Sequence, residues 1–173
     1  MKQIGVLALQ GDFEAHTAIL ESLGAAAIMV RTPAGLDGLD GLIIPGGEST
    51  TIALGIEREG LADPLREFGG PILGTCAGMI VLGREHLGIL DISTRRNAFG
   101  RQVRSFEVDL DLWGERVRAA FIRAPWVEEV GDGVEVLAEV DGHPIAVIGN
   151  NVLAVAFHPE ITGETRLHRW LLA

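Results

Sequence analysis

The chain has a single cysteine, no tyrosine, and only one lysine among its 14 basic residues. One cysteine excludes an intrachain disulfide, which favours a cytoplasmic location, because disulfides are rare in that compartment. No apolar run approaches the roughly 20 residues that a membrane helix needs, and the first run lacks the features of a signal peptide. We therefore expect no contact with a membrane.

Positive charge is also scarce. The 24 acidic residues outnumber the 14 basic ones and give a formal net charge of −10. A protein that binds nucleic acid presents a basic face to the phosphates, so we expect no nucleic-acid partner.

The length of 173 residues predicts one domain, residues 1–173, with a substantial core. In the first half, short unbroken apolar runs alternate with segments whose apolar residues have helical spacing. Such runs are typical of strands in a parallel sheet that is covered on both faces. The expected strands are residues 4–9, 26–30, 41–45 and 71–74, and the expected first helix is residues 14–23.

The second half has a different pattern. Shorter runs with period-two features are separated by Gly, Asp and Asn turns, which is typical of antiparallel strands. These runs are residues 99–112, 118–125, 134–140, 143–149 and 152–157, and a helix is expected over residues 164–172. The whole pattern predicts a single α/β domain with a central mixed, mostly parallel sheet flanked by helices, as in flavodoxin-like folds.

The only cysteine lies in the stretch Gly74-Thr75-Cys76-Ala77-Gly78, where a predicted strand meets a predicted helix. A nucleophile elbow puts its reactive residue on such a sharp turn and needs small residues two positions before and after it. The helix N-terminus also favours negative charge, and so the reactive thiolate. Free cysteine is, however, among the most often buried residues, so the stretch alone fits a nucleophile and a small core residue equally well.

His158 is the histidine best placed to act as a base. It follows the predicted strand 152–157, at the edge of an α/β sheet where sites collect. Glu160 would face the same side in an extended segment, and Pro159 biases His158 away from the helical region. The alternative is a His-Pro turn beside a solvated glutamate. The other four histidines have plain settings: His16 and His168 on helix faces, His86 in a loop and His143 in a turn.

A glycine-rich turn, Pro45-Gly46-Gly47, ends the third predicted strand. The backbone N–H groups of Gly47 and Ala77 are candidates for an oxyanion hole, although a plain turn before a capped helix fits equally well. Three strand ends together then carry a nucleophile, an N–H loop and a His-x-Glu pair, with no metal-ligand cluster. This combination indicates hydrolysis of an amide or ester through a thioester.

These motifs resemble those of class I (triad-type) glutamine amidotransferases and, within them, of the glutaminase subunits of pyridoxal 5′-phosphate synthases. The stretches PGGEST, GTCAG and HPE are typical of the superfamily, and RNAFGRQ with FIRAP is typical of the subunit family. The resemblance spans essentially the whole chain. The segment near residues 84–88 is shorter than this family would predict, which indicates a tighter turn or different packing there.

The resemblance implies hydrolysis of L-glutamine to L-glutamate and ammonia, with the ammonia passing to a barrel-shaped synthase subunit in a hetero-oligomeric complex. Cys76 would be the nucleophile, His158 the base and Glu160 its orienting residue. It implies neither a cofactor nor a metal. An arginine in the site would suit the α-carboxylate of glutamine. The implied glutamine contacts are Gly46, Gly47, Glu48, Arg96, Ile122 and Arg123, and Gln10 matches a residue that supports the oxyanion loop.

Two other functions stay open. A glutaminase subunit of another pathway, such as histidine biosynthesis, would share the triad and differ in its partner surface. A catalytically silent regulatory subunit could use the same fold, but the intact Cys76, His158 and Glu160 argue against it.

Overall fold

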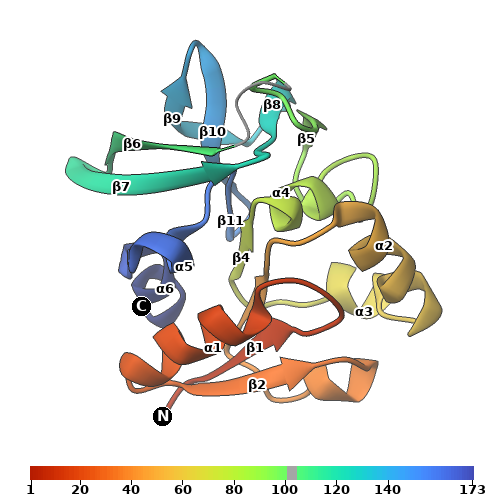
Figure 1. The fold of residues 1–173 in the computed structure, drawn as a ribbon. Helices are drawn as coiled ribbons and strands as arrows, with labels where there is room; N and C mark the ends of the chain where they lie inside the picture. The colour runs from red at the N-terminus through yellow and green to blue at the C-terminus, as the bar shows by residue number, and fades with distance from the viewer. Residues whose placement is uncertain (101–104) are drawn as a thin grey trace.

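The computed structural model describes residues 1–100 and 105–173, and a seven-stranded sheet forms its centre (Figure 1). The strand order is β2-β1-β3-β4-β11-β10-β9. All pairs from β2 to β11 are parallel, and β10 and β9 add antiparallel neighbours at one edge. The strands are β1 (Gln3–Leu7), β2 (Ala26–Val30), β3 (Gly41–Ile44), β4 (Ile72–Thr75), β9 (Glu135–Val140), β10 (His143–Gly149) and β11 (Val152–Val155). The predicted mixed, mostly parallel sheet is confirmed.

Helices lie on both sides of this sheet. Figure 1 shows α1, α5 and α6 on one side and α2, α3 and α4 on the other. The helices are α1 (Phe13–Ser22), the 3₁₀ helix η1 (Pro33–Leu36), α2 (Ser49–Arg58), α3 (Ala62–Arg66), α4 (Ala77–Leu82), α5 (Pro159–Thr162) and α6 (Arg166–Leu172). Among the described residues, no helix has the length and apolar character needed to cross a membrane.

Four strands of the second half stay outside the central sheet. β5 (Ile92–Arg95) pairs with β8 (Trp126–Val130), and β6 (Ser105–Leu112) pairs with β7 (Glu115–Ile122), both antiparallel. The sequence did not predict β5 or the separation into two small sheets. Part of the predicted run 99–112, residues 101–104, lies outside the described residues. The turn near residue 84 is closed by the Gly88 N–H, which donates to the Gly83 carbonyl at 2.8 Å.

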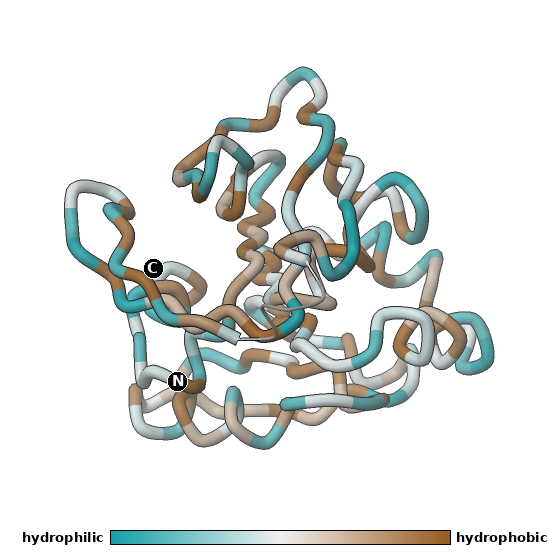
Figure 2. Tube along the Cα trace, turned by 45° about the horizontal axis from the view of Figure 1, so that its top comes forward, coloured by the Kyte–Doolittle hydropathy of each residue, from teal (hydrophilic) through white to brown (hydrophobic). Residues whose placement is uncertain are grey.

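The core follows from the apolar runs. Every residue of β3, β4 and β11 is buried, as expected of strands with helices on both faces. Figure 2 shows hydrophobic segments through the middle of the molecule and hydrophilic ones mainly at outer turns. The centre of the sheet is therefore a rigid platform for the residues that follow its strands.

The direction of β11 differs from the expectation. The sequence pattern grouped it with the antiparallel strands, but β11 pairs in parallel with β4, with Val155 opposite Thr75. It is antiparallel only to β10. Parallel pairing brings the carboxyl ends of β4 and β11 to the same edge of the sheet, which places Cys76 and His158 on neighbouring strand ends.

Candidate active site

Cys76 occupies a strained turn between β4 and α4. Its φ of 51° and ψ of −109° lie in a region that residues with a side chain rarely adopt, at a cost of about 1–3 kcal/mol. The Cys76 N–H donates to the Val155 carbonyl at 2.8 Å, which ties the turn to β11. The side chain is nearly buried but borders a pocket. Such stored strain is typical of functional residues and does not suit a plain core cysteine.

The two glycines that flank Cys76 have a steric role. A methyl group at Gly78 would lie 2.0 Å from the Ile44 carbonyl oxygen, and one at Gly74 would lie 3.0 Å from the Gly78 backbone. The contact at Gly78 is closer than backbone atoms allow, and the one at Gly74 would force the Gly78 backbone to shift by a few tenths of an ångström, so glycine at both positions lets the helix lie close to the sheet. The spacing that indicated a nucleophile elbow thus has the physical cause that such an elbow requires.

His158 is held beside Cys76 by Glu160. Its Nδ1 lies 2.5 Å from Glu160 Oε1, and its backbone N–H donates to the Ala120 carbonyl at 2.8 Å. The segment is not extended as predicted: His158 precedes the short helix α5, and Glu160 lies in its first turn. Pro159 starts this helix because its missing N–H costs nothing at the first helical position. The predicted pairing is nevertheless present.

The environment of His158 favours its charged form. Burial alone lowers the pKa, but hydrogen bonds and negative charge from Cys76 and Glu160 outweigh it and raise the pKa of His158 to about 10. Asp12, in the loop after β1, adds a carboxylate oxygen 3.6 Å from His158 Nδ1. A protonated imidazole next to a thiol is the arrangement that stabilises a thiolate.

The protein is expected to lose stability as the pH rises from about 6.5 to about 10. Folded His158 keeps its proton up to about pH 10, whereas an unfolded histidine releases it near 6.5. The folded state therefore binds more protons in this interval, and a stabilisation that is complete below pH 6.5 is lost as the pH rises. Urea unfolding at several pH values measures this slope. His158→Gln should flatten it, and an equal slope in that variant would contradict the assignment.

Gly46 leaves room for His158 to lie beside Cys76. A methyl group at this position would lie 2.6 Å from His158 Cε1 and 3.3 Å from Cys76 Cβ. Its carbonyl accepts the Asp12 N–H at 3.0 Å, which joins the loop after β1 to the loop after β3.

Gly46→Ala is expected to lower turnover about 100-fold, because displacing a reacting group by about 1 Å has that effect. The added methyl group would push the imidazole of His158 away from the Cys76 thiol. Steady-state kinetics measures the loss, and Gly69→Ala is the matched control, since a methyl group there meets nothing within 4 Å. Unchanged turnover in Gly46→Ala would show that the two side chains do not need this spacing.

Gln10 supports the loop that follows β3. Its Oε1 accepts the Glu48 N–H at 2.7 Å, and a methyl group at Gly47 would lie 2.4 Å from the same oxygen. Gly47 has a φ of 153°, and the loop therefore depends on glycine for both conformation and space. The orientation of the Gly47 and Glu48 peptide is thus coupled to the Gln10 side chain.

The predicted residues surround one pocket of about 420 Å³. Gly46 and Glu160 are not part of its wall, although both lie against His158. The pocket is also bordered by Asp12, Ser49, Ile80 and Asn97, which were not predicted as site residues. Ser49 and Asn97 lie within the quoted motifs PGGEST and RNAFGRQ, but the motifs alone did not assign them a role. The predicted residues in the wall are Gln10, Gly47, Glu48, Cys76, Ala77, Arg96, Ile122, Arg123 and His158.

The two arginines of the pocket differ in their partners. Arg96 Nη2 lies 2.6 Å from Glu48 Oε1, and its Nη1 donates to Thr50 Oγ1 at 3.1 Å. The backbone N–H and the hydroxyl of Thr51 donate to the Glu48 carboxylate. These hydrogen bonds, together with the charge of Arg96, lower the pKa of the Glu48 carboxyl. Arg123 has a φ of 46° and makes no ion pair with the described residues. Its charge is therefore available to an anionic group in the pocket.

One group of side chains has metal-ligand character. Ligand atoms of Asp12, His158 and Glu160 lie within 4.8 Å of one another. The 2.5 Å between His158 Nδ1 and Glu160 Oε1 leaves no room for an ion between them and fits a hydrogen bond. We therefore assign the group to orientation of the imidazole.

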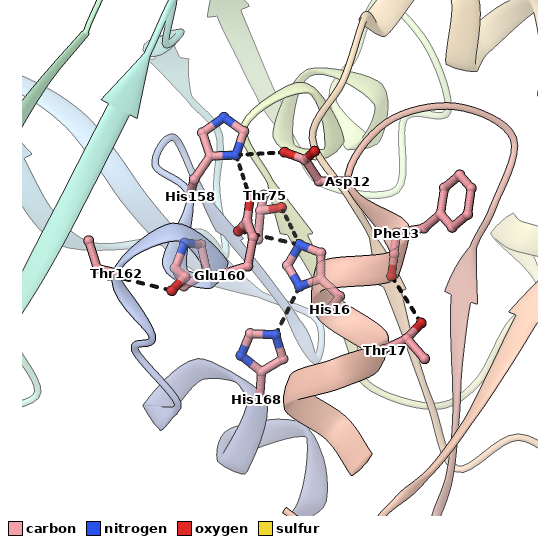
Figure 3. A network of polar contacts seen from close by, with 10 residues as sticks. Asp12, Phe13, His16, Thr17, Thr75, His158, Glu160, Thr162 and His168 are labelled. Atoms are coloured by element: carbon pink, nitrogen blue, oxygen red, sulfur yellow. Dashed lines mark hydrogen bonds and ion pairs between the residues drawn. The ribbon is translucent and has the colours of Figure 1, made fainter. Parts of the chain in front are cut away.

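Two further histidines lie behind this group, contrary to the plain settings predicted for them. His16 and His168 are fully buried and contact each other, and Figure 3 shows His16 next to Glu160. The burial of these two histidines could have been predicted in part from the sequence. His16 precedes the buried Leu20 by one helical turn, and His168 lies between Leu167 and Leu171, so both are on apolar helix faces.

Comparison with known proteins identifies close relatives. A sequence profile of the SNO glutamine amidotransferase family matches residues 6–173. The pyridoxal 5′-phosphate synthase subunit PdxT of Mycobacteroides abscessus is 53% identical over 180 residues, which cover 96% of this chain and 93% of that protein. A crystal structure of a glutamine amidotransferase has a TM-score of 0.92 at 46% identity, with 98% and 96% of the two chains covered. PurLQS from Thermotoga maritima shares the fold, with a TM-score of 0.81 at 21% identity over 99% of this chain and 97% of that one.

Proposed function

Because the chain belongs to the SNO glutamine amidotransferase family, we propose that it hydrolyses L-glutamine to L-glutamate and ammonia as the glutaminase subunit of a pyridoxal 5′-phosphate synthase. The observation that carries the proposal is the strained Cys76 beside a histidine that Glu160 holds at 2.5 Å. A family fold without that arrangement would suit a silent regulatory subunit. All residues of the domain, 1–173, would serve this one activity.

The reaction would proceed through a thioester. The Cys76 thiolate attacks the side-chain amide carbon of glutamine, and the carbonyl oxygen takes the negative charge, which N–H groups at Gly47 and Ala77 would stabilise. His158 then gives its proton to the amide nitrogen as the carbon–nitrogen bond breaks and ammonia leaves. The neutral imidazole next takes a proton from water, whose hydroxyl cleaves the γ-glutamyl thioester and restores the thiolate and imidazolium.

The pocket supports the proposed contacts with glutamine. Arg123, with no carboxylate partner among the described residues, would bind the α-carboxylate, and the Glu48 carboxylate would suit the α-ammonium. Arg96 would act through Glu48, which it already contacts. Gly47 and Ile122 would form the backbone and apolar walls around the side chain of the substrate. Gly46, which is not in the wall, would act through His158 and Cys76, which it borders. Gln10 would set the orientation of the oxyanion loop.

A partner synthase subunit would receive the ammonia in a hetero-oligomeric complex. The lone free cysteine supports a cytoplasmic location, although it does not identify the partner. The decisive experiment measures glutamate release by this chain alone and after addition of a pyridoxal 5′-phosphate synthase barrel subunit. A strong rise with that subunit supports the proposal. A rise only with a cyclase barrel indicates another pathway, and silence in all conditions indicates a regulatory subunit.

A further inference from the structure

Four polar side chains form a row in which each lies next to the following one: His158, Glu160, and a buried pair of histidines, His16 and His168. His16 of α1 and His168 of α6 have no exposed surface, and 2.8 Å separates His16 Nδ1 from His168 Nε2. On its other side, His16 Nε2 lies 3.5 Å from Glu160 Oε2 and 3.3 Å from Thr75 Oγ1. Figure 3 shows Glu160 between His158 and His16, with His168 beyond. The row therefore leads from the proposed base into the core.

The second oxygen of Glu160 needs a donor. Oε1 is used by His158 Nδ1 at 2.5 Å, whereas Oε2 is buried and has no hydrogen bond of normal length to the described residues. A buried carboxylate oxygen without a donor is costly. The ring nitrogen that faces Oε2 is His16 Nε2, and a shift of a few tenths of an ångström would bring the two within hydrogen-bond distance.

Burial favours the neutral form of both histidines of the pair. Burial, followed by the charges of His168 and His158, lowers the pKa of His16 well below 6.5. Burial also lowers the pKa of His168 to about 4, against the opposing effect of the Glu164 carbonyl. A neutral imidazole has one N–H, so the contact at 2.8 Å needs an N–H on one ring and a lone pair on the other. The proton position on one histidine therefore decides that on the other.

We propose that His16 is a positioning residue that donates its Nε2–H to Glu160 Oε2, while His168 donates its own Nε2–H to His16 Nδ1. The inference rests on the proposed function, because it acts through the role of Glu160 in orienting His158. The charge of the carboxylate selects this tautomer, since it attracts an N–H and repels a lone pair. In the opposite tautomer His16 donates from Nδ1 to His168 and accepts from the Thr75 hydroxyl, which leaves Glu160 Oε2 facing a lone pair. That tautomer would give an N–H to His168 Nδ1, a buried atom that has no hydrogen-bond partner among the described residues and is close to the Glu164 carbonyl. The full charge of the Glu160 carboxylate attracts an N–H more strongly than the dipole of a carbonyl does, so the proposed tautomer is favoured.

Nitrogen NMR of protein labelled with ¹⁵N-histidine tests the tautomer directly. At pH 7 we expect protonated Nε2 and unprotonated Nδ1 on both His16 and His168, with signals assigned from His16→Gln and His168→Gln. A proton on Nδ1 of His16 would overturn the proposal. The measurement needs no turnover, so it decides the proton positions even if the proposed glutaminase activity fails its own test.

Kinetics of variants tests the effect on catalysis. His16→Leu fills the buried space with an apolar side chain and removes the donor. We expect kcat to fall about tenfold, by analogy with the roughly 10- to 100-fold losses that follow removal of a residue that orients a metal-ligating side chain. KM should change little. The kcat–pH profile should shift, because the raised pKa of His158 depends in part on its contact with Glu160. His16→Gln can offer an amide N–H near the position of Nε2 and should recover most of kcat.

Leu20→Ala is the matched control in the same helix. Leu20 is fully buried in α1, so its truncation costs stability through lost packing but removes no hydrogen-bond donor. It should leave the kcat–pH profile in place. If His16→Leu and Leu20→Ala lose equal activity with the same profile, or if His16→Gln recovers nothing, His16 only packs and the proposal is wrong.

Discussion

Cys76→Ala is expected to lower glutamine turnover at least about 10⁴-fold, because no other group in the pocket can form the thioester. Cys76 is the only cysteine of the chain, so no second thiol can replace it. The backbone strain at φ 51° is the same for alanine, so the elbow should keep its shape. Glutamate formation measured with the synthase subunit present gives the result.

Binding of glutamine provides the control for this variant. The proposed contacts of the amino-acid part, Glu48 and Arg123, lie on other segments and are unchanged by the substitution. Calorimetric titration should therefore detect glutamine with an affinity close to that of the unmodified protein. Turnover that survives in Cys76→Ala would rule out the thioester mechanism, whereas loss of both binding and folding would leave Cys76→Ser as the variant to measure.

Glu160→Gln is expected to lower kcat about 10³- to 10⁴-fold, the loss seen when the carboxylate of a triad becomes an amide. The carboxylate accepts from His158 Nδ1 at 2.5 Å and so leaves Nε2 for the interaction of His158 with Cys76. An amide N–H would instead favour the tautomer with an unprotonated Nδ1. The negative charge that helps to raise the pKa of His158 would also be lost. The measurement is kcat across a pH series.

Glu164→Gln makes the same chemical change four residues later in the chain. Glu164 pairs with Arg166 at 2.8 Å, at the start of α6, and has no contact with the triad. This variant should keep its turnover and pH profile. If Glu160→Gln also retained its turnover, Glu160 would be a structural residue, and the base would need no orienting carboxylate.

The sequence predicts the local parts of the site well. The elbow around Cys76 is visible because its constraint is local: two glycines at fixed offsets let the helix pack within contact distance of Ile44. His158 is visible because it follows an apolar strand. The predicted pairing with Glu160 is present in the structure, although the reason is a short helix and not an extended segment.

The remaining features depend on contacts between distant segments. The spacing and the number of apolar residues do not show whether β11 runs parallel or antiparallel to β4, because a buried strand has the same sequence pattern in either direction. The contact between His16 and His168 joins residues 152 positions apart and depends on α1 packing beside α6. The pairing of Arg96 with Glu48 is equally non-local, so the motif alone could not separate the roles of the two pocket arginines.

The strand order leads us to expect that the surroundings of Cys76 form late in folding. β11 fills the place between β4 and β10 but is the last strand in the sequence, so β4 has an open edge until β11 pairs with it. His158 follows Cys76 by about 80 residues, and closing so long a loop is slow compared with forming local structure. The same pairing supplies the Val155 carbonyl that ties down the Cys76 turn. In a partly folded chain we therefore expect Cys76 to lack both His158 and the fixed turn, which would limit side reactions of the thiol before the site is formed.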